Sequence, residues 1–158
     1  MKKLLPVILF LFALPAFGQA SRAEQIDAFG NIPCDEYLAR AERMMTEQAN
    51  NPDAQIYVFV YEGKEKRAAY KNGKFAGSTY VLPSPGLAKA RIESMRKLLK
   101  SYKRPLENYV FVNGGFREEF TVEIWLVPAG AEPPKAAPSL EKMNYRKGRA
   151  YGFCLSCC

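Results

Sequence analysis

The sequence predicts an α+β fold in which two helices pack on a small mixed sheet as a two-layer sandwich. Two segments place apolar residues at helical spacing, and three other segments are β-branched and aromatic runs of strand length. The predicted element order is α-β-α-β-β, with a basic hairpin-like excursion after the first strand. Without an N-terminal export segment, about 138 residues remain, which is enough for one domain with its own core.

Residues 1–20 are predicted to be a cleavable signal peptide. Lys2 and Lys3 precede an apolar run from Leu4 to Phe17, and small residues follow it. Cleavage after Gly18 and retention as an uncleaved anchor are the alternatives. No later stretch is apolar for about 18 residues, so we expect no transmembrane span in the mature chain. The expected location is the periplasm or the cell envelope, including the outer membrane, or secretion beyond it.

Residues 21–33 show no periodicity and are predicted to be a leader before a domain at 34–128. Residues 34–50 repeat apolar side chains at helical spacing, and the Asn51-Pro52-Asp53 sequence ends that helix. The run QIYVFVY at 55–61 is apolar on both faces, which predicts a central strand.

Residues 62–86 are predicted to form the basic excursion, with a tight turn at Asn72-Gly73 because both residues accept positive φ. A second helix follows at 87–102. Residues 108–112 and 120–127 are predicted strands, and Asn113-Gly114-Gly115 is predicted to be a turn. The Pro- and Ala-rich residues 129–142 are expected to be a linker, and residues 143–158 a basic, cysteine-rich tail.

Arg91 lies inside the apolar face of the second predicted helix. One interpretation is that its methylene stem packs on this face while the guanidinium reaches water. The other is that packing near the sheet holds the guanidinium ready for a bidentate contact with a carboxylate.

The segment LAKARIESMRKLL at 87–99 resembles the second helix of the OmpA-like domain family. The helix-to-strand steps at 51–61 and 102–110 and the strand TVEI at 121–124 are similar to the same family. The resemblance implies that Arg91 binds a carboxylate of the peptidoglycan stem peptide. The family aspartate that follows the first strand falls near Glu62 here, so Glu62 is its implied substitute. The family's Asn-Arg pair before the last strand is replaced by Phe120-Thr121.

The mature chain has four cysteines, Cys34, Cys154, Cys157 and Cys158. In an exported protein the default is disulfide bonding, either within the chain or to a partner. A bridge from Cys34 to the C-terminal group would tie the tail to the first helix. The CxxC spacing of Cys154 and Cys157 leaves thiol-redox chemistry open, and four thiolates leave zinc binding open.

The composition argues against catalysis. The sequence has no histidine, which removes the commonest general base and metal ligand. No glycine-rich phosphate loop opens a helix. We therefore expect no enzyme, no cofactor and no catalytic residue.

The charge balance favours an anionic partner. Without Lys2 and Lys3, 21 basic side chains face 16 acidic ones, which gives the mature chain a net charge of +5. This charge fits peptidoglycan or another anionic envelope polymer, and no signature of nucleic-acid binding accompanies it.

The predicted function is thus an exported, non-catalytic cell-envelope binding module that contacts its ligand through Arg91. One alternative is an interaction or scaffold protein that has lost this ligand site and carries a disulfide-forming tail. A second alternative is a thiol-redox or metal-binding protein.

Overall fold

The computed structural model describes residues 22–155, so the predicted signal peptide, Cys157 and Cys158 lie outside the described residues. The described chain has an α+β fold, which confirms the predicted class. No helix within residues 22–155 has the length and apolar character needed to cross a membrane. The elements, in chain order, are β1 (Glu24–Phe29), α1 (Cys34–Asn50), β2 (Gln55–Lys71), β3 (Lys74–Val81), α2 (Leu87–Ser101), the short 3-10 helix η1 (Leu106–Asn108), β4 (Tyr109–Glu119) and β5 (Thr121–Val127).

Strand β2 is the centre of a mixed sheet. It pairs antiparallel with β5 through residues 55–61 and parallel with β4 through residues 56–64. Strand β1 pairs antiparallel with β5, and β3 pairs antiparallel with the second half of β2. The strand order is therefore β1-β5-β2-β3, with β4 also paired to β2.

Strand β1 lies where the sequence predicted a leader. Residues 24–29 pair with β5 from Glu24 opposite Leu126 to Phe29 opposite Val122. Of this strand, Phe29 alone is buried. The expectation of a leader was wrong for these residues, because half of this edge strand is polar and its alternation of polar and apolar residues extends only from Gln25 to Ala28.

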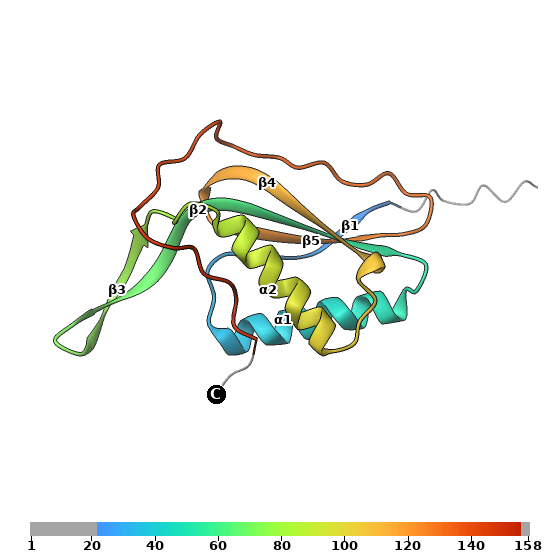
Figure 1. Cartoon of the computed structure of the whole chain (residues 1–158), viewed down its shortest axis with the longest axis horizontal. Helices are drawn as coiled ribbons and strands as arrows, with labels where there is room; N and C mark the ends of the chain where they lie inside the picture. The colour runs from blue at the N-terminus through green and yellow to red at the C-terminus, as the bar shows by residue number, and fades with distance from the viewer. Residues whose placement is uncertain (1–21, 156–158) are drawn as a thin grey trace, which may run out of the picture.

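The core lies between the sheet and the two helices, which occupy the same side of the sheet in Figure 1. The helical spacing predicted from the sequence places the buried side chains of α1 and α2 in this core. Its most completely buried apolar members include Tyr37, Ile56, Val58, Val60, Leu87, Leu98, Leu99, Phe120, Val122 and Ile124.

The basic excursion is a hairpin that continues β2. Strand β2 runs ten residues past the predicted end at Tyr61, turns at Asn72-Gly73 and returns as β3. Both turn residues have positive φ, 51° for Asn72 and 75° for Gly73, as the Asn-Gly pair predicted. The hairpin projects from the body of the molecule (Figure 1).

Gly63 allows the link between β4 and β5 to cross close to β2. A Cβ at position 63 would lie 2.2 Å from the carbonyl carbon of Glu119. The Phe120 amide donates to the Lys64 carbonyl at 3.0 Å, which fixes this crossing. The register of β2 against β4 shifts between Glu62 and Lys64, so β2 has a bulge at this point.

The turn predicted at Asn113-Gly114-Gly115 is instead an irregularity within β4. The register shifts there, with Val60 opposite Asn113 and Tyr61 opposite Gly115. A Cβ on Gly114 would lie 2.4 Å from the Tyr61 ring. The glycine pair therefore makes room for an aromatic side chain, and the strand continues to Glu119.

The predicted linker and tail pack on the domain. Residues 129–142 run along the side of the sheet opposite the helices (Figure 1). The amides of Ser139 and Leu140 donate to the Phe116 carbonyl at 2.9 and 3.1 Å. The tail then returns to the helices, where Phe153 is buried in the core.

Candidate functional site

Helix α2 places Arg91 in the interior, where the side chain is 3% exposed. Its Nη2 donates to Glu65 Oε1 at 3.1 Å and to Asn31 Oδ1 at 3.2 Å. Its Nη1 donates to the Gly152 carbonyl at 3.2 Å. The guanidinium thus joins the loop after β1, the middle of β2 and the C-terminal tail.

Aromatic rings surround the same guanidinium. Its Cζ lies 4.2 Å from the Phe153 ring centroid, 4.4 Å from that of Tyr151 and 5.2 Å from that of Phe120. Such contacts stabilise a desolvated cation. Burial lowers the pKa of Arg91, and the electrostatic attraction of Tyr151 and Glu65 opposes this shift. An arginine remains protonated under these conditions, so the site contains a buried cation.

Glu65 is the carboxylate that pairs with Arg91, and its side chain is 0% exposed. It also pairs with Arg67 at 2.9 Å and with Arg146 at 3.9 Å. The Tyr151 hydroxyl donates to Glu65 Oε1. We call Glu65, Arg67, Arg91, Arg146 and Tyr151 the Glu65 cluster. Burial, together with the hydrogen bond to Glu65, raises the pKa of Tyr151.

Glu62 is also buried, at 3% exposure, but has different partners. Its Oε1 accepts the Ala88 amide at 3.0 Å, and its Oε2 accepts the Tyr145 hydroxyl at 2.6 Å. Ala88 is in the first turn of α2, where amides lack partners within the helix and a negative charge is favoured. Glu62 therefore caps α2 from the neighbouring strand, and Glu65 provides the carboxylate for Arg91.

The bulge at Gly63 explains why Glu62 and Glu65, three residues apart, both contact residues of α2. In a regular strand, residues 62 and 65 would point to opposite faces. The register shift between Glu62 and Lys64 changes this alternation. The role of Glu65 was not predicted from the sequence, because the bulge depends on the crossing of the β4–β5 link, which no local pattern reveals.

The C-terminal tail contributes Arg146 and Tyr151 to the Glu65 cluster and packs on α1 and α2 beside it. Phe153 stacks on Tyr37 with ring centroids 4.1 Å apart, and its amide donates to Ser94 Oγ at 2.8 Å. A disulfide joins Cys154 to Cys34 at the start of α1, with Cα atoms 5.8 Å apart. The expectation of disulfide bonding is confirmed for this pair. Burial raises the pKa of Tyr37, in agreement with a dry contact between the tail and α1.

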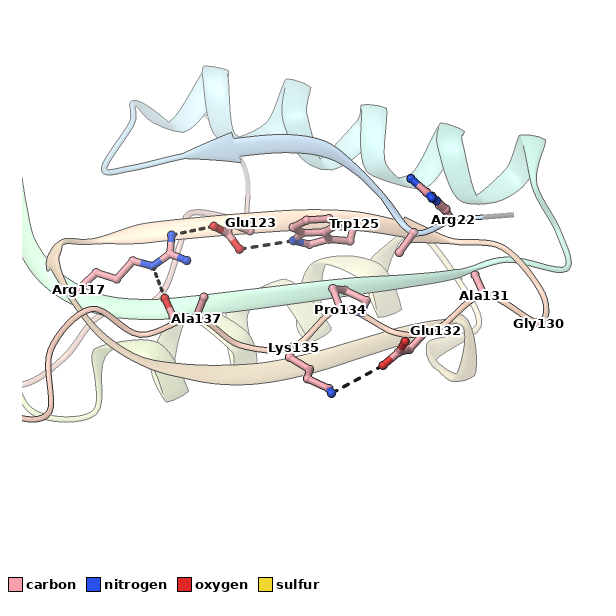
Figure 2. A pocket seen from close by; sticks show the side chains of 11 residues that line it. Arg22, Arg117, Glu123, Trp125, Gly130, Ala131, Glu132, Pro134, Lys135 and Ala137 are labelled. Carbon is pink, nitrogen blue, oxygen red and sulfur yellow. Dashed lines mark hydrogen bonds and ion pairs between the residues drawn. The ribbon is translucent and has the colours of Figure 1, made fainter. Parts of the chain in front are cut away.

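A second site lies on the other side of the sheet, in a cavity of about 640 Å³ beneath the linker (Figure 2). Arg117 Nη1 donates to Glu123 Oε1 at 2.7 Å, and Trp125 Nε1 approaches Glu123 Oε2 at 3.4 Å. Arg117 also donates to the Ala137 carbonyl at 3.1 Å, and its Cζ lies 3.6 Å from the centroid of the Tyr61 ring. These contacts hold the linker on the sheet.

The metal and redox alternatives depend on the cysteines, of which residues 22–155 include Cys34 and Cys154. Within residues 22–155, no group of three or more His, Cys, Asp or Glu side chains is placed to hold a metal ion. Cys154 is bonded to Cys34 rather than to Cys157, which lies outside the described residues. The arrangement of buried ion pairs and hydrogen bonds instead has a clear structural effect, since it fixes the tail on the domain.

No protein-family model, curated protein or solved structure matches the chain.

Proposed function

We propose that this chain is an exported, non-catalytic interaction module of the cell envelope in which Arg91 anchors the chain's own C-terminal tail. The observation that carries the proposal is the set of Arg91 partners. The guanidinium donates to Glu65, Asn31 and the Gly152 carbonyl, all within the same chain. A side chain so enclosed acts as an internal anchor.

An OmpA-like arrangement is part of this proposal. With the β2–β3 hairpin set aside, α1, β2, α2, β4 and β5 follow one another in the order that the resemblance implies. The position of both helices on one side of the sheet in Figure 1 agrees with a two-layer sandwich. Strand β1 and the docked tail are additions to the order expected from the sequence.

Binding of peptidoglycan or another anionic envelope polymer through Arg91 is a second candidate. It is favoured by one contact, that of the Gly152 carbonyl with Arg91 Nη1 at 3.2 Å. This carbonyl oxygen occupies a place where an oxygen of a ligand carboxylate could accept the same N–H. An external ligand would have to displace the tail, which the Cys34–Cys154 disulfide tethers.

Sedimentation with purified peptidoglycan separates the two candidates. The variants are Arg91→Lys and, as a matched control on the exposed surface of α1, Arg43→Lys. If Arg91 is an internal anchor, Arg91→Lys exposes the tail to protease and leaves the amount of sedimented protein equal to wild type. Two results together would make Arg91 a ligand site. Less of a folded Arg91→Lys protein than of Arg43→Lys would sediment with peptidoglycan, and reduction of the Cys34–Cys154 disulfide would increase the amount of wild type that sediments.

Export has its own test. Residues 1–30 fused to alkaline phosphatase, which needs disulfides formed outside the cytoplasm, are expected to give an active reporter. An inactive fusion that is present at normal levels would contradict export and therefore the proposed location in the cell envelope.

A further inference from the structure

The distal half of the β2–β3 hairpin exposes aromatic side chains that have no role in the core. Tyr70 is 68% exposed and Phe75 is 66% exposed. They face each other across the hairpin and pack edge to face, with centroids 6.1 Å apart at 76°. Because burial of such rings is favourable, two adjacent exposed rings at the end of a projecting element indicate a surface that meets something apolar.

Lysines lie directly beside these rings. Lys71 and Lys74 are opposite each other in the register, at the two ends of the Asn72-Gly73 turn. Like charges directly opposite on a hairpin are destabilising. The sequence contains no Asp or Glu between Glu65 and Glu93, and the ion pairs of the described residues include neither lysine. The hairpin thus carries a positive charge that the described chain does not neutralise.

We call Tyr70, Lys71, Lys74 and Phe75 the hairpin tip. Within the described residues, its strands pair only with each other, because β4 leaves β2 at Lys64. A two-stranded hairpin has marginal stability alone in water. This hairpin is held at its base, where Arg67 pairs with Glu65 and Tyr80 donates to Glu119 at 3.0 Å. The base is fixed, and the hairpin tip is presented away from the body (Figure 1).

The shape of the hairpin tip distinguishes between partners. No residue of the hairpin tip lines the cavity beside Trp125 or the depression beside Arg91. A Cβ added at Gly73 or Gly77 would meet no atom within 4 Å, so this end of the hairpin is convex and open. A convex tip has no walls to hold a sugar ring or a peptide side chain, and it fits a soft, extended surface better than a discrete ligand.

We propose that the hairpin tip binds the surface of a lipid bilayer that contains anionic phospholipid. Tyr70 and Phe75 enter the interfacial region, where amphipathic and aromatic rings are favoured. Lys71 and Lys74 lie within reach of lipid phosphates, and their flexible stems let the ammonium groups stay at the headgroups. The inference rests on the proposed function, since it names the envelope component that the interaction module meets.

Vesicle sedimentation with the disulfide-bonded protein, residues 21–158, tests this inference. The probes are vesicles of phosphatidylcholine with phosphatidylglycerol and vesicles of phosphatidylcholine alone. We expect binding to the anionic vesicles that weakens with added salt, because exposed charges are screened. Each lysine at an anionic surface contributes about fivefold in affinity, so Lys71→Gln/Lys74→Gln is expected to reduce binding by about 30-fold.

The variants separate loss of binding from loss of fold. Lys71→Gln/Lys74→Gln removes a like-charge pair, so the hairpin itself should become no less stable. Tyr70→Ser/Phe75→Ser should reduce binding to anionic vesicles at all salt concentrations. Lys97→Gln/Lys100→Gln removes the same charge from the exposed surface of α2 and should bind like wild type.

Equal loss in the α2 control, or equal binding to neutral and anionic vesicles, would overturn the inference. The inference would also be overturned if the protein bound peptidoglycan through the hairpin tip and did not bind vesicles. The partner of the tip would then be an anionic polymer. These outcomes are independent of the export reporter. An active reporter with no vesicle binding removes only the lipid inference, and an inactive reporter removes the proposed function.

Discussion

At the scale of single residues, the main feature of the interior is a buried ion pair between Glu65 and Arg91. Glu65 is fully buried and Arg91 is 3% exposed, and two further arginines and a tyrosine hydroxyl contact the same carboxylate. A buried ion pair adds little stability compared with apolar residues, but removal of one partner leaves an uncompensated charge. The Glu65 cluster therefore fixes the position of the tail, and its net contribution to the stability of the fold is small.

Replacement of Glu65 tests this view. Glu65→Gln keeps the shape of the side chain but leaves Arg91 without its carboxylate. We expect the free energy of unfolding to fall by about 3 kcal/mol, the cost of breaking a buried pair from one side. Urea denaturation measures this change, and limited proteolysis should cut the tail faster. Glu93→Gln on the exposed face of α2 is the control, and an equal effect of both variants would contradict the assignment.

Titration of Tyr145 gives a second test at this scale. Burial and the hydrogen bond to Glu62 raise the pKa of Tyr145 from 10.0 to about 12. A raised pKa in the folded state means that the neutral form is favoured there. Its contribution to stability is present below pH 10 and is lost as the pH rises toward 12.

The free energy of unfolding should therefore fall more steeply between these pH values in wild type than in Tyr145→Phe. Urea denaturation at several alkaline pH values checks this difference. Other tyrosines with raised pKa, including Tyr151, remain in both proteins and serve as the common background. Parallel curves for the two proteins would show that Tyr145 does not contribute.

At the scale of elements, the long strand β2 organises the whole site. Its first half is buried between β4 and β5, and its second half leaves the sheet as the hairpin. The bulge at Gly63 separates the halves and directs Glu62 and Glu65 to α2 and the tail. A single local irregularity therefore positions two buried carboxylates.

The variant Gly63→Ala tests the crossing at this bulge. Its Cβ would lie 2.2 to 2.5 Å from backbone atoms of Glu119 and Phe120, which cannot move aside as a flexible side chain would. We expect a loss of about 3 kcal/mol or more in unfolding free energy, at the upper end of the range for overpacking. Ser78→Ala on the exposed hairpin is the control, and thermal or urea unfolding is the measurement. Unchanged stability of Gly63→Ala would show that the β4–β5 link passes elsewhere.

At the scale of the whole molecule, the C-terminal tail completes the domain. The disulfide closes a loop across a sequence separation of 120 residues, and Phe153 packs with Tyr37, Phe29 and Phe120. The linker on the opposite side of the sheet is held by Arg117 and the Tyr61 hydroxyl. Residues 129–155 therefore wrap around both sides of the fold.

Loss of the disulfide tests how far this wrapping stabilises the protein. Closure of a loop of this length contributes up to about 4.7 kcal/mol through the unfolded state. Cys154→Ser should lower the unfolding free energy by about 2 to 4 kcal/mol, and wild type under reducing conditions should show the same loss. An unchanged midpoint in urea would mean that the tail is not tethered through Cys154.

Phe153→Ala separates tail packing from the tether. Removal of a buried phenylalanine costs about 3 to 5 kcal/mol when it is part of a core. We expect a loss of unfolding free energy in this range, measured by urea denaturation. Reaction of the protein with a thiol-blocking reagent checks that the Cys34–Cys154 disulfide remains intact. Leu155→Ala, two residues further and exposed, should change the stability little.

Local sequence patterns were sufficient for much of the fold. The spacing of apolar residues identified α1 and α2, the QIYVFVY run identified the start of β2, and Asn72-Gly73 identified the hairpin turn. These features depend on neighbours along the chain, so periodicity and turn preferences reveal them. Arg91 also stood out because it interrupts an apolar face.

The remaining features arise from residues that are far apart in the chain. β1 is a strand because β5 offers it an edge, and Glu65 meets Arg91 because the bulge at Gly63 turns it toward α2. The tail belongs to the core because Cys34 and Phe153 find partners more than a hundred residues away. Such contacts are selected by three-dimensional packing and charge compensation, which leave no periodic trace in the amino-acid order.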